Sequence, residues 1–522
     1  MRIGVNLFPL RPQVAGGLEF YVRNLLPEMF ELGGSDHFYY LITAPWNDKE
    51  IDFGRGPYRK IFIDASSGAG VIDRLRARLR RSHWDIYRCA MELNVDVWFC
   101  PMMDLNPRHI DIPSVVTVPD IQYEFYPQFF TPEELRHREL TVKPSCRLAT
   151  GVITISEYSK KTLLGRHELD PGKVHSICLA AGREYSLQGA REAWPSVVQR
   201  FGLKEGYLFY PANTWPHKNH EMLLTALQRL KKRGLTPELV LTGAQIESME
   251  RMKELASQLG CESQLHHLDY VDRRFFPGLY FGAACLVFPS LFEGFGIPLV
   301  EAMACGCPVA SSNVCSIPEV VGEAAVLFDP RSPDSIADAL EAVLRNESLR
   351  QQLVKKGLRQ ATLFSWEKAA RETLAVFEKV CGQRVPRPAG YIPPQDIVEG
   401  FYADGWAGPK MLIRRVELSR WRTMVLEGET SCNCSPMQIR VCANREAIAE
   451  LQIATPSTFN QKIALPPASP DSPLADLQIL TSGHFVPRKI GLNEDTRRLS
   501  FRVHNLMLID AVGNTMSFHG KQ

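Results

Sequence analysis

The chain has 522 residues, of which 45% are hydrophobic and 23% are charged, a composition typical of a globular protein with two or three domains. Its 60 basic residues against 58 acidic ones leave no overall field that would attract nucleic acid, so no nucleic-acid partner is expected. The 13 cysteines are scattered, many of them in apolar segments, which favours the reducing cytoplasm over a disulfide framework. No apolar run reaches the roughly 18 residues of a membrane span, and the first strand leaves no room for a signal peptide.

Strands alternate with helices over residues 1 to about 380, the pattern of parallel sheets with helical crossovers. The first strand is followed by a loop with Gly16 and Gly17 and then by an amphipathic helix. The strands expected in this first cycle are RIGVNLF, FYYLIT, KIFID, VDVWFC, SVVTV and TGVITIS. A second cycle starts near residue 207 and contains YLFYPA, ELVLTG, QLHHLD, AACLVFPS, PVASS and AAVLFDP.

Two successive cycles predict an α/β protein with two doubly wound, Rossmann-like domains that face each other across a cleft. We assign residues 1–180 to the first domain, 205–365 to the second and 366–383 to a crossover helix. The proline-rich stretch 384–400 has no periodicity and is typical of a linker. Residues 401–522 contain short alternating strands separated by turns, which predicts an all-β sandwich.

The segment FEGFGIPLVEAMACGCPVA (292–310) follows a buried strand and predicts a glycine-rich turn that leads into a helix. Gly294 and Gly296 allow the backbone to approach a ligand or to take positive φ angles. The turn would present free N–H groups and the positive end of a helix dipole at the carboxyl edge of a parallel sheet, where anions bind. Glu293 and Glu301 bracket these amides, and their carboxylates suit sugar and ribose hydroxyls. The alternative is that Glu301 is a solvated residue of the first helical turn.

This segment resembles the nucleotide-sugar signature of the family 4 retaining glycosyltransferases, which are built on the two-domain GT-B fold. Further landmarks occur in the order of that family, namely the Gly16–Gly17 pair, ITISEYSKKTL (153–163), YPANTWPHKNHEMLLTAL (210–227) and SIPEVVGEAAVLFDP (316–330). The resemblance covers roughly residues 1 to 380. It implies a transferase that uses a nucleotide sugar and requires neither a metal ion nor another cofactor.

The resemblance also implies a donor site. Its donor-binding residues would be Gly16, Gly17, Asn213, His217, Lys218, Gly294, Phe295, Gly296, Ile297 and Glu301. Glu293 would contact hydroxyls of the donor sugar, Glu301 would bind the ribose, and Lys218 would neutralise the leaving diphosphate. The alternatives are a solvated loop lysine at position 218 and a simple helix-starting turn at the glycine pair. Many relatives carry arginine where this chain has His217, which leaves the second phosphate contact open.

The first domain departs from the family pattern after the strand SVVTV. Many relatives carry His-Asp at this place, with the histidine beside the reacting sugar, whereas this chain has Pro119 and Asp120. Proline cannot donate a hydrogen bond, so the work of that histidine would fall to Asp120, to another group or to the substrate itself. Asp120 is the catalytic candidate of this domain, next to Glu293 and Lys218 of the second. Alternatively, Asp120 only orders the turn after the strand.

These features favour a retaining hexosyltransferase (EC 2.4) that moves a hexose, mannose in the first place, to a lipid-linked or polysaccharide acceptor in cell-surface glycan synthesis such as that of O-antigen. GDP-mannose is the first choice of donor, and a UDP-sugar is the second. Retention would follow from front-face attack assisted by the leaving phosphate, since no nucleophile stands out beneath the sugar. The alternatives are a nucleotide-sugar epimerase, which Lys218 and the paired glutamates disfavour, and a catalytically inactive sugar-binding scaffold subunit.

Two segments bear on partners and location. The helix-compatible stretch 71–84 has apolar residues on one face and arginines elsewhere, so it could rest on anionic lipid. A salt-bridged surface helix is the alternative. The expected location is cytoplasmic, with peripheral contact at the inner face of the membrane. The sandwich resembles carbohydrate-binding or interaction modules, in which Trp406 and Trp421 would stack on sugar rings unless they belong to the core.

Overall fold

The structure is a computed structural model, and it divides into two compact units, residues 1–387 and 388–522, which are described separately. The described residues are 1–12, 16–63, 86, 89–90, 93, 95–108, 110, 112–243, 248–383, 399–401, 406–418, 420–430, 436–444, 446–467, 474–482, 484, 501–513 and 515–517. The helix expected at 71–84 and all but the last two residues of the expected linker lie outside these ranges.

The first sheet of the larger unit is parallel throughout. Its strands are β1 (Arg2–Asn6), β2 (Phe38–Thr43), β3 (Tyr58–Phe62), β4 (Val97–Cys100), β5 (Ser114–Thr117), β6 (Gly151–Thr154) and β7 (Val174–Ser176). They lie in the order β3-β2-β1-β4-β5-β6-β7. Strands β4, β5 and β6 are buried along their whole length, as expected of a parallel sheet covered on both faces. The sequence does not predict β7, and β3 begins two residues before the expected KIFID.

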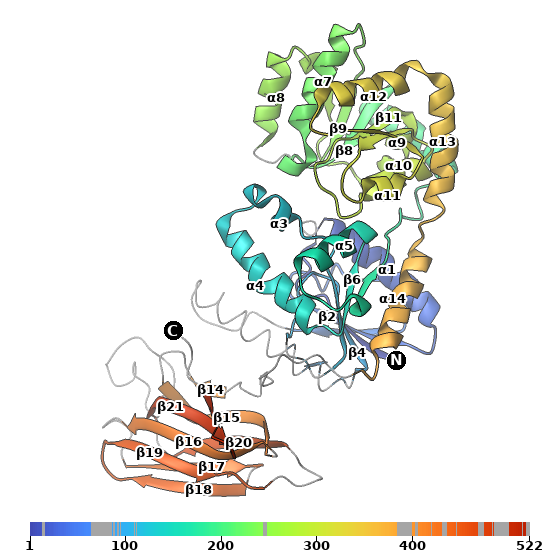
Figure 1. The fold of residues 1–522 in the computed structure, drawn as a ribbon. Helices are drawn as coiled ribbons and strands as arrows, with labels where there is room; N and C mark the ends of the chain where they lie inside the picture. Colours follow the sequence, from blue (N-terminus) through green and yellow to red (C-terminus); the bar gives the residue numbers. More distant parts are fainter. Residues whose placement is uncertain are drawn as a thin grey trace. The chain divides into compact units, whose positions relative to one another are not determined.

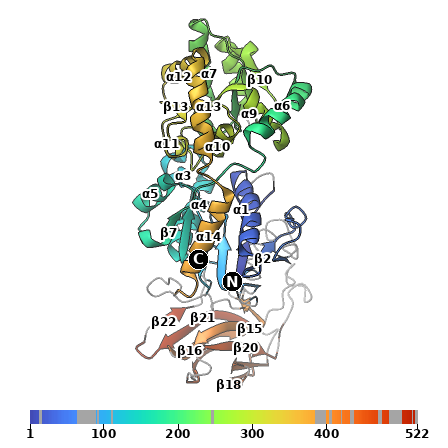
Figure 2. The same cartoon turned by 90° about the vertical axis from the view of Figure 1, so that its right-hand side faces the viewer.

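Helices cover both faces of this sheet (Figures 1 and 2). They are α1 (Gly17–Gly33), α3 (Gln122–Phe125), α4 (Pro132–Leu148), α5 (Glu157–Arg166) and α14 (Trp366–Val380), with the short 3₁₀ helices η1 (Pro127–Phe129) and η2 (Pro171–Lys173). The chain returns to this sheet at α14, which packs against α1 and β6. The ring of Trp366 lies 5.8 Å from that of Phe20 in α1, and Phe377 lies 5.1 Å from Phe99 in β4.

The second sheet is also parallel. Its strands are β8 (Tyr207–Pro211), β9 (Leu239–Thr242), β10 (Leu265–His267), β11 (Ala283–Phe288), β12 (Val309–Ser312) and β13 (Ala325–Phe328), in the order β10-β9-β8-β11-β12-β13. Its helices are α6 (Leu187–Phe201), α7 (His220–Lys232), α8 (Ser248–Gln258), α9 (Phe276–Gly282), α10 (Ile297–Ala304), α11 (Ile317–Val321), α12 (Pro333–Arg345) and α13 (Glu347–Ala361), with the 3₁₀ helices η3 (Pro216–Lys218), η4 (Glu262–Gln264) and η5 (Arg273–Phe275). None of the helices within the described ranges is long and apolar enough to cross a membrane.

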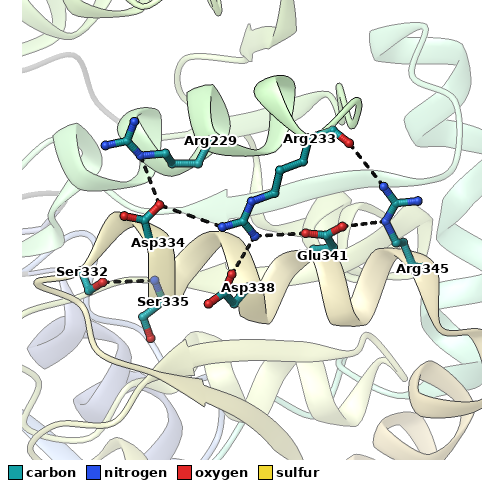
Figure 3. Close-up of polar contacts among 8 residues, drawn as sticks. All are labelled: Arg229, Arg233, Ser332, Asp334, Ser335, Asp338, Glu341 and Arg345. Carbon is teal, nitrogen blue, oxygen red and sulfur yellow. Dashed lines mark hydrogen bonds and ion pairs between the residues drawn. The ribbon is translucent and has the colours of Figure 1, made fainter.

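An ion network joins α7 to α12 on the surface of this second lobe (Figure 3). It contains Arg229, Arg233, Asp334, Asp338, Glu341 and Arg345. Arg233 is its centre, with Nη1 lying 2.6 Å from Asp338 Oδ1 and 3.0 Å from Glu341 Oε2. Solvent screens ion pairs of this kind, so the network adds little to the stability of the fold.

The smaller unit is an antiparallel β-sandwich around its own core. Its strands are β14 (Glu399–Phe401), β15 (Trp406–Glu417), β16 (Trp421–Thr430), β17 (Met437–Ala443), β18 (Glu446–Ile453), β19 (Thr458–Ala464), β20 (Leu474–Thr481), β21 (Phe501–Asp510) and β22 (Thr515–Ser517). The main path runs β18-β17-β20-β15-β21-β16-β19, and its two edge strands β18 and β19 are in contact, so the sheet folds back on itself. Trp421 is 2% exposed within this core, which rules it out as a sugar-stacking ring. The side chain of Trp406 lies outside the described part.

The two units have separate apolar cores, which predicts two independent unfolding transitions. The core of the smaller unit draws its buried residues from Met411 to Leu508, and those of the larger unit lie between Ile3 and Val380. Differential scanning calorimetry should therefore resolve two heat-absorption peaks, and a chain ending at Arg387 should keep one of them with an unchanged midpoint. Loss of both transitions in the shortened chain would contradict this division.

Candidate functional site

The site lies at the topological switch point of the second sheet, where the order in which strands are added reverses. Strands β8 and β11 are neighbours, although β9 and β10 separate them along the chain, so the chain leaves β8 toward one edge and β11 toward the other (Figure 1). Loops that follow such a pair diverge from a common crevice at the carboxyl ends of the strands, which is where α/β sheets bind ligands. Lys218, at the end of η3, follows β8, and Glu293 follows β11.

An ion pair joins these two loops. Lys218 Nζ lies 2.6 Å from Glu293 Oε1, and both side chains are largely buried, with 19% and 13% of their surfaces exposed. The backbone holds the same register, because the N–H of Leu291 donates to the carbonyl oxygen of His217 at 2.8 Å and the Tyr210 hydroxyl donates to that of Lys218 at 2.8 Å. The alternative of a solvated loop lysine is therefore wrong for Lys218, although its role toward a diphosphate stays a prediction.

Asp120 reaches this pair from the other sheet. It follows β5, and its Oδ1 accepts a hydrogen bond from the N–H of Gln122 at 2.9 Å, so it also orders the turn. A Cβ on Gly294 would lie 2.9 Å from Asp120 Oδ2 and 3.0 Å from the carbonyl oxygen of Pro119, so this close approach requires glycine. Burial, with a further contribution from Glu293, raises the pKa of the Asp120 carboxyl, and Lys218 acts in the opposite direction. The three catalytic candidates thus meet, although they come from three separate segments.

The signature turn has the geometry of an anion-binding backbone. Gly296 has φ 95° and precedes α10, whose N-terminus has no side-chain cap. Ser316 Oγ donates to the carbonyl oxygens of Glu293 at 2.9 Å and Phe295 at 3.3 Å. In a trans peptide the N–H of the next residue points the opposite way, so the amides of Gly294 and Gly296 point away from Ser316. The Phe295 side chain is 1% exposed and packs on the half-buried ring of Phe364, so only its backbone is available to a ligand.

Glu301 lies in a second polar cluster. It is 4% exposed, which overturns the alternative of a solvated helix residue. The Tyr280 hydroxyl donates to its Oε2 at 2.8 Å, and the Tyr185 hydroxyl also bonds to it. Burial raises the pKa of the Glu301 carboxyl, whereas Arg273 and the two hydroxyls act in the opposite direction. A carboxylate held from one side by tyrosines keeps acceptor capacity for hydroxyls of a ligand.

The other predicted donor residues differ in what surrounds them. Burial, followed by the neighbouring Lys218, lowers the pKa of His217 to about 4, so this histidine is neutral near pH 7 and does not replace the charge of an arginine. Asn213 is exposed. Its Oδ1 lies close to Gly243, the residue after β9, since a Cβ added to Gly243 would be 2.8 Å from it. Ile297 is half-buried at the start of α10.

The glycine pair at the start of α1 is open on its side-chain side. Gly16 has φ 52°, a region that favours glycine, and it precedes the helix that begins at Gly17. A Cβ on either residue would meet no atom within 4 Å. Steric crowding therefore does not explain this pair, and an approach to phosphates stays a prediction.

Sequence reasoning missed the residues that hold the candidates in place. Tyr280 contacts Glu301 across 21 residues of sequence, and Ser316 reaches back to the signature turn across 23. Arg273 lies with Cζ 4.1 Å from the centre of the Phe20 ring in α1. No sequence spacing signals such contacts, because each depends on how helices and loops that are distant in sequence become neighbours in the fold. Among the described residues, no cluster of His, Cys, Asp or Glu is suited to hold a metal ion.

Replacing Gly294 with alanine should push the Asp120 loop away from the signature turn. The added methyl would lie within about 3 Å of Asp120 Oδ2 and the Pro119 carbonyl, so we expect a loss of about 1–3 kcal/mol in the free energy of unfolding. Gly165→Ala is the matched control, because a Cβ there meets nothing within 4 Å. Chemical denaturation measures both, and equal stability of the two variants would contradict the close approach.

Glu301→Gln should stabilise the folded chain at neutral and mildly alkaline pH. Because burial raises the pKa of this carboxyl above its ordinary value of 4.5, the folded state binds the proton more tightly than the unfolded chain does. The stability that this proton contributes is complete below about pH 4.5 and is lost as the pH rises through the raised pKa. Thermal unfolding should show a difference between variant and wild type that grows with pH; a constant difference would count against this account.

Comparison with known proteins identifies the family. Residues 196–360 match the family model described as "Glycosyl transferases group 1". The chain is 32% identical over 267 residues to O-antigen chain mannosyltransferase B of Escherichia coli, covering 51% of this chain and 70% of that protein.

Two solved structures share the fold, each over 73% of this chain. Sucrose-phosphate synthase of Thermosynechococcus elongatus has TM-score 0.58, 19% identity and 99% of its chain covered, and HepE of Anabaena, solved with UDP and glucose, has TM-score 0.57, 16% identity and 100% covered. The chain therefore belongs to the group 1 glycosyltransferases, the family 4 hexosyltransferases of GT-B fold, and carries an additional C-terminal antiparallel β-sandwich.

Proposed function

We propose that this glycosyltransferase transfers a mannosyl group from GDP-mannose, with retention of anomeric configuration, to a lipid-linked or polysaccharide acceptor in cell-surface glycan synthesis. The observation that carries the proposal is the meeting of Lys218, Glu293 and Asp120 at the switch point of the second sheet. The choice of mannose is supported by the Escherichia coli relative, which is an O-antigen chain mannosyltransferase. In this proposal residues 205–365 bind the donor and residues 1–180 bind the acceptor.

A diphosphate at the signature turn would draw Lys218 from its carboxylate partner. The dianionic β-phosphate of the leaving group is a stronger attractor for an ammonium than a single carboxylate, and the outward amides of Gly294 and Gly296 add hydrogen bonds. Glu293 would then be released to accept hydroxyls of the sugar. His217 is neutral, so its contribution to phosphate binding would be a hydrogen bond rather than a charge.

The transfer would proceed on one face of the sugar. The bond between the anomeric carbon and the β-phosphate oxygen breaks, the acceptor oxygen forms its bond on the same face, and the acceptor proton passes to the departing phosphate oxygen. Lys218 would stabilise the charge that develops on that oxygen. Asp120 has a raised pKa and lies next to Gly294, so it could hold a proton and orient either the sugar or the acceptor hydroxyl.

The reaction would take place in the cytoplasm, and at the inner face of the membrane where the acceptor is lipid-linked. The cysteines assessed among the described residues are free thiols, many of them buried, which is compatible with a reducing compartment.

A catalytically inactive, sugar-binding scaffold subunit is the second candidate. Pro119 favours it, because the histidine that many relatives carry at this place is absent, and the additional sandwich suits an interaction role. The two candidates share donor binding and differ only in turnover.

Isothermal titration with GDP tests the donor site. Lys218→Ala should weaken binding about tenfold to 100-fold, because a hydrogen bond to a charged group contributes about 1.5–3 kcal/mol. Glu301→Ala should weaken binding through loss of the ribose contact. Lys232→Ala is the matched control for loss of a positive charge, since it lies exposed in α7 of the same lobe. Wild-type affinity in both Lys218→Ala and Glu301→Ala would overturn the assignment.

Release of GDP from GDP-mannose in the presence of lipid extracted from producing cells separates the two candidate functions. The transferase should release GDP and lose this activity by a factor on the order of 100 or more in Lys218→Ala. GDP binding without turnover on any acceptor, and without slow hydrolysis, would support the scaffold. A parallel titration with UDP tests the choice of nucleotide.

A further inference from the structure

We propose that Phe292 is a positioning residue, whose ring is held by the first lobe so that Glu293 takes its place at the donor sugar only when the two lobes are together. The inference rests on the proposed role of Glu293. It concerns a residue that touches no reacting group and acts through its neighbour in the chain.

The ring of Phe292 is enclosed by aromatic side chains from the other lobe. Phe292 is 2% exposed. Its ring centre lies 5.5 Å from that of Phe125, 6.0 Å from that of Tyr126 and 6.0 Å from that of Tyr158. Phe125 is the last residue of α3, Tyr126 follows it, and Tyr158 lies in the first turn of α5. We call these three residues the aromatic clasp. The edge-on and tilted geometries are the favourable ones for aromatic pairs.

Polar contacts from the same lobe hold the residues on both sides of Glu293. The Tyr126 hydroxyl donates to the carbonyl oxygen of Leu291 at 3.3 Å, and Ser159 Oγ donates to that of Gly294 at 3.3 Å. Residues 291, 292 and 294 are therefore each contacted by the first lobe, in addition to the second-lobe contacts that join Leu291 to His217 and Glu293 to Ser316. Glu293 keeps only its side-chain rotation, and Lys218 restrains that.

A contact in the reverse sense comes from Glu319, a second-lobe residue whose side chain holds the first-lobe helix α5. Its two carboxylate oxygens accept hydrogen bonds from the N–H groups of Glu157 at 2.8 Å and Tyr158 at 2.9 Å, at the N-terminus of α5. A carboxylate is favourable at this end of a helix dipole. The helix that carries Tyr158 and Ser159 is thus held to the lobe that carries Phe292, which makes the contact set reciprocal.

These contacts make the position of Glu293 depend on whether the first lobe lies against the second. When the clasp is closed, the backbone of the signature turn has one arrangement around Glu293. When the clasp opens, residues 291, 292 and 294 lose their first-lobe contacts, and the turn keeps only those within the second lobe, such as Leu291 to His217 and Glu293 to Ser316. Ordinary packing between lobes would also bury Phe292, but it would not make the turn depend on side chains of the first lobe.

The test compares Phe292→Ala, Tyr158→Ala and Phe292→Tyr, with Phe328→Ala as the control for loss of a buried phenyl ring elsewhere in the same lobe. Steady-state release of GDP from GDP-mannose gives kcat and KM, and titration gives the affinity for GDP. Phe292→Ala and Tyr158→Ala should each lower kcat on the order of 100-fold with little change in GDP affinity, because misplacement of a group by about 1 Å has effects of that size. Phe292→Tyr, which keeps an aromatic ring at this position, should have a kcat close to that of the wild type. A loss of kcat no larger than that of Phe328→Ala would overturn the inference.

Amide hydrogen exchange provides a readout that needs no donor. Protection of the Leu291 amide, which donates to the His217 carbonyl in this turn, should fall in Phe292→Ala and in Tyr158→Ala, while β11 remains protected. Unchanged protection of the turn in Tyr158→Ala would overturn the inference even if Phe292→Ala does not fold. If the proposed donor is wrong, the wild-type protein will release no GDP from GDP-mannose. The exchange measurement uses no donor, so it still tests the role of the aromatic clasp.

Discussion

The ion pair between Lys218 and Glu293 is the contact on which the site depends. It joins the loops after β8 and β11, two adjacent parallel strands from which the chain continues toward opposite edges of the sheet. The pair places a cation and an acceptor at one end of the signature turn. Burial raises the pKa of the Asp120 carboxyl and lowers that of His217 to about 4, so His217 adds no positive charge beside the pair. Lys218 is the cation that lies at this end of the turn.

The two glutamates of the signature segment, Glu293 and Glu301, have different surroundings and are assigned different roles toward the donor. Glu293 is bonded to a lysine and lies beside the first lobe, whereas Glu301 is enclosed by Tyr280 and Tyr185. The segment between them turns its amides away from Ser316. Such an arrangement suits a ligand with a sugar at one end, a diphosphate in the middle and a ribose at the other. The aromatic clasp adds a connection from this segment to the first lobe.

Much of the fold follows from local patterns. Short apolar runs such as VWFC and SVVT are buried strands, and the glycine-rich turn leads into a helix that begins at Ile297. Strand β7 is only three residues long, too short for a pattern to mark it. The contacts of Tyr280 with Glu301 and of Tyr126 with Leu291 join segments that are 21 and 165 residues apart, so they follow from strand order rather than from any local signal.

A crystal structure of the chain with GDP bound is the most direct measurement of the central claim. The account predicts β-phosphate oxygens at hydrogen-bond distance, about 3 Å, from Lys218 Nζ and from the amides between Gly294 and Ile297, with the ribose hydroxyls at Glu301. Lys218 would then contact phosphate in place of Glu293. A diphosphate bound away from this turn, with the Lys218–Glu293 pair intact and no ribose contact at Glu301, would contradict it.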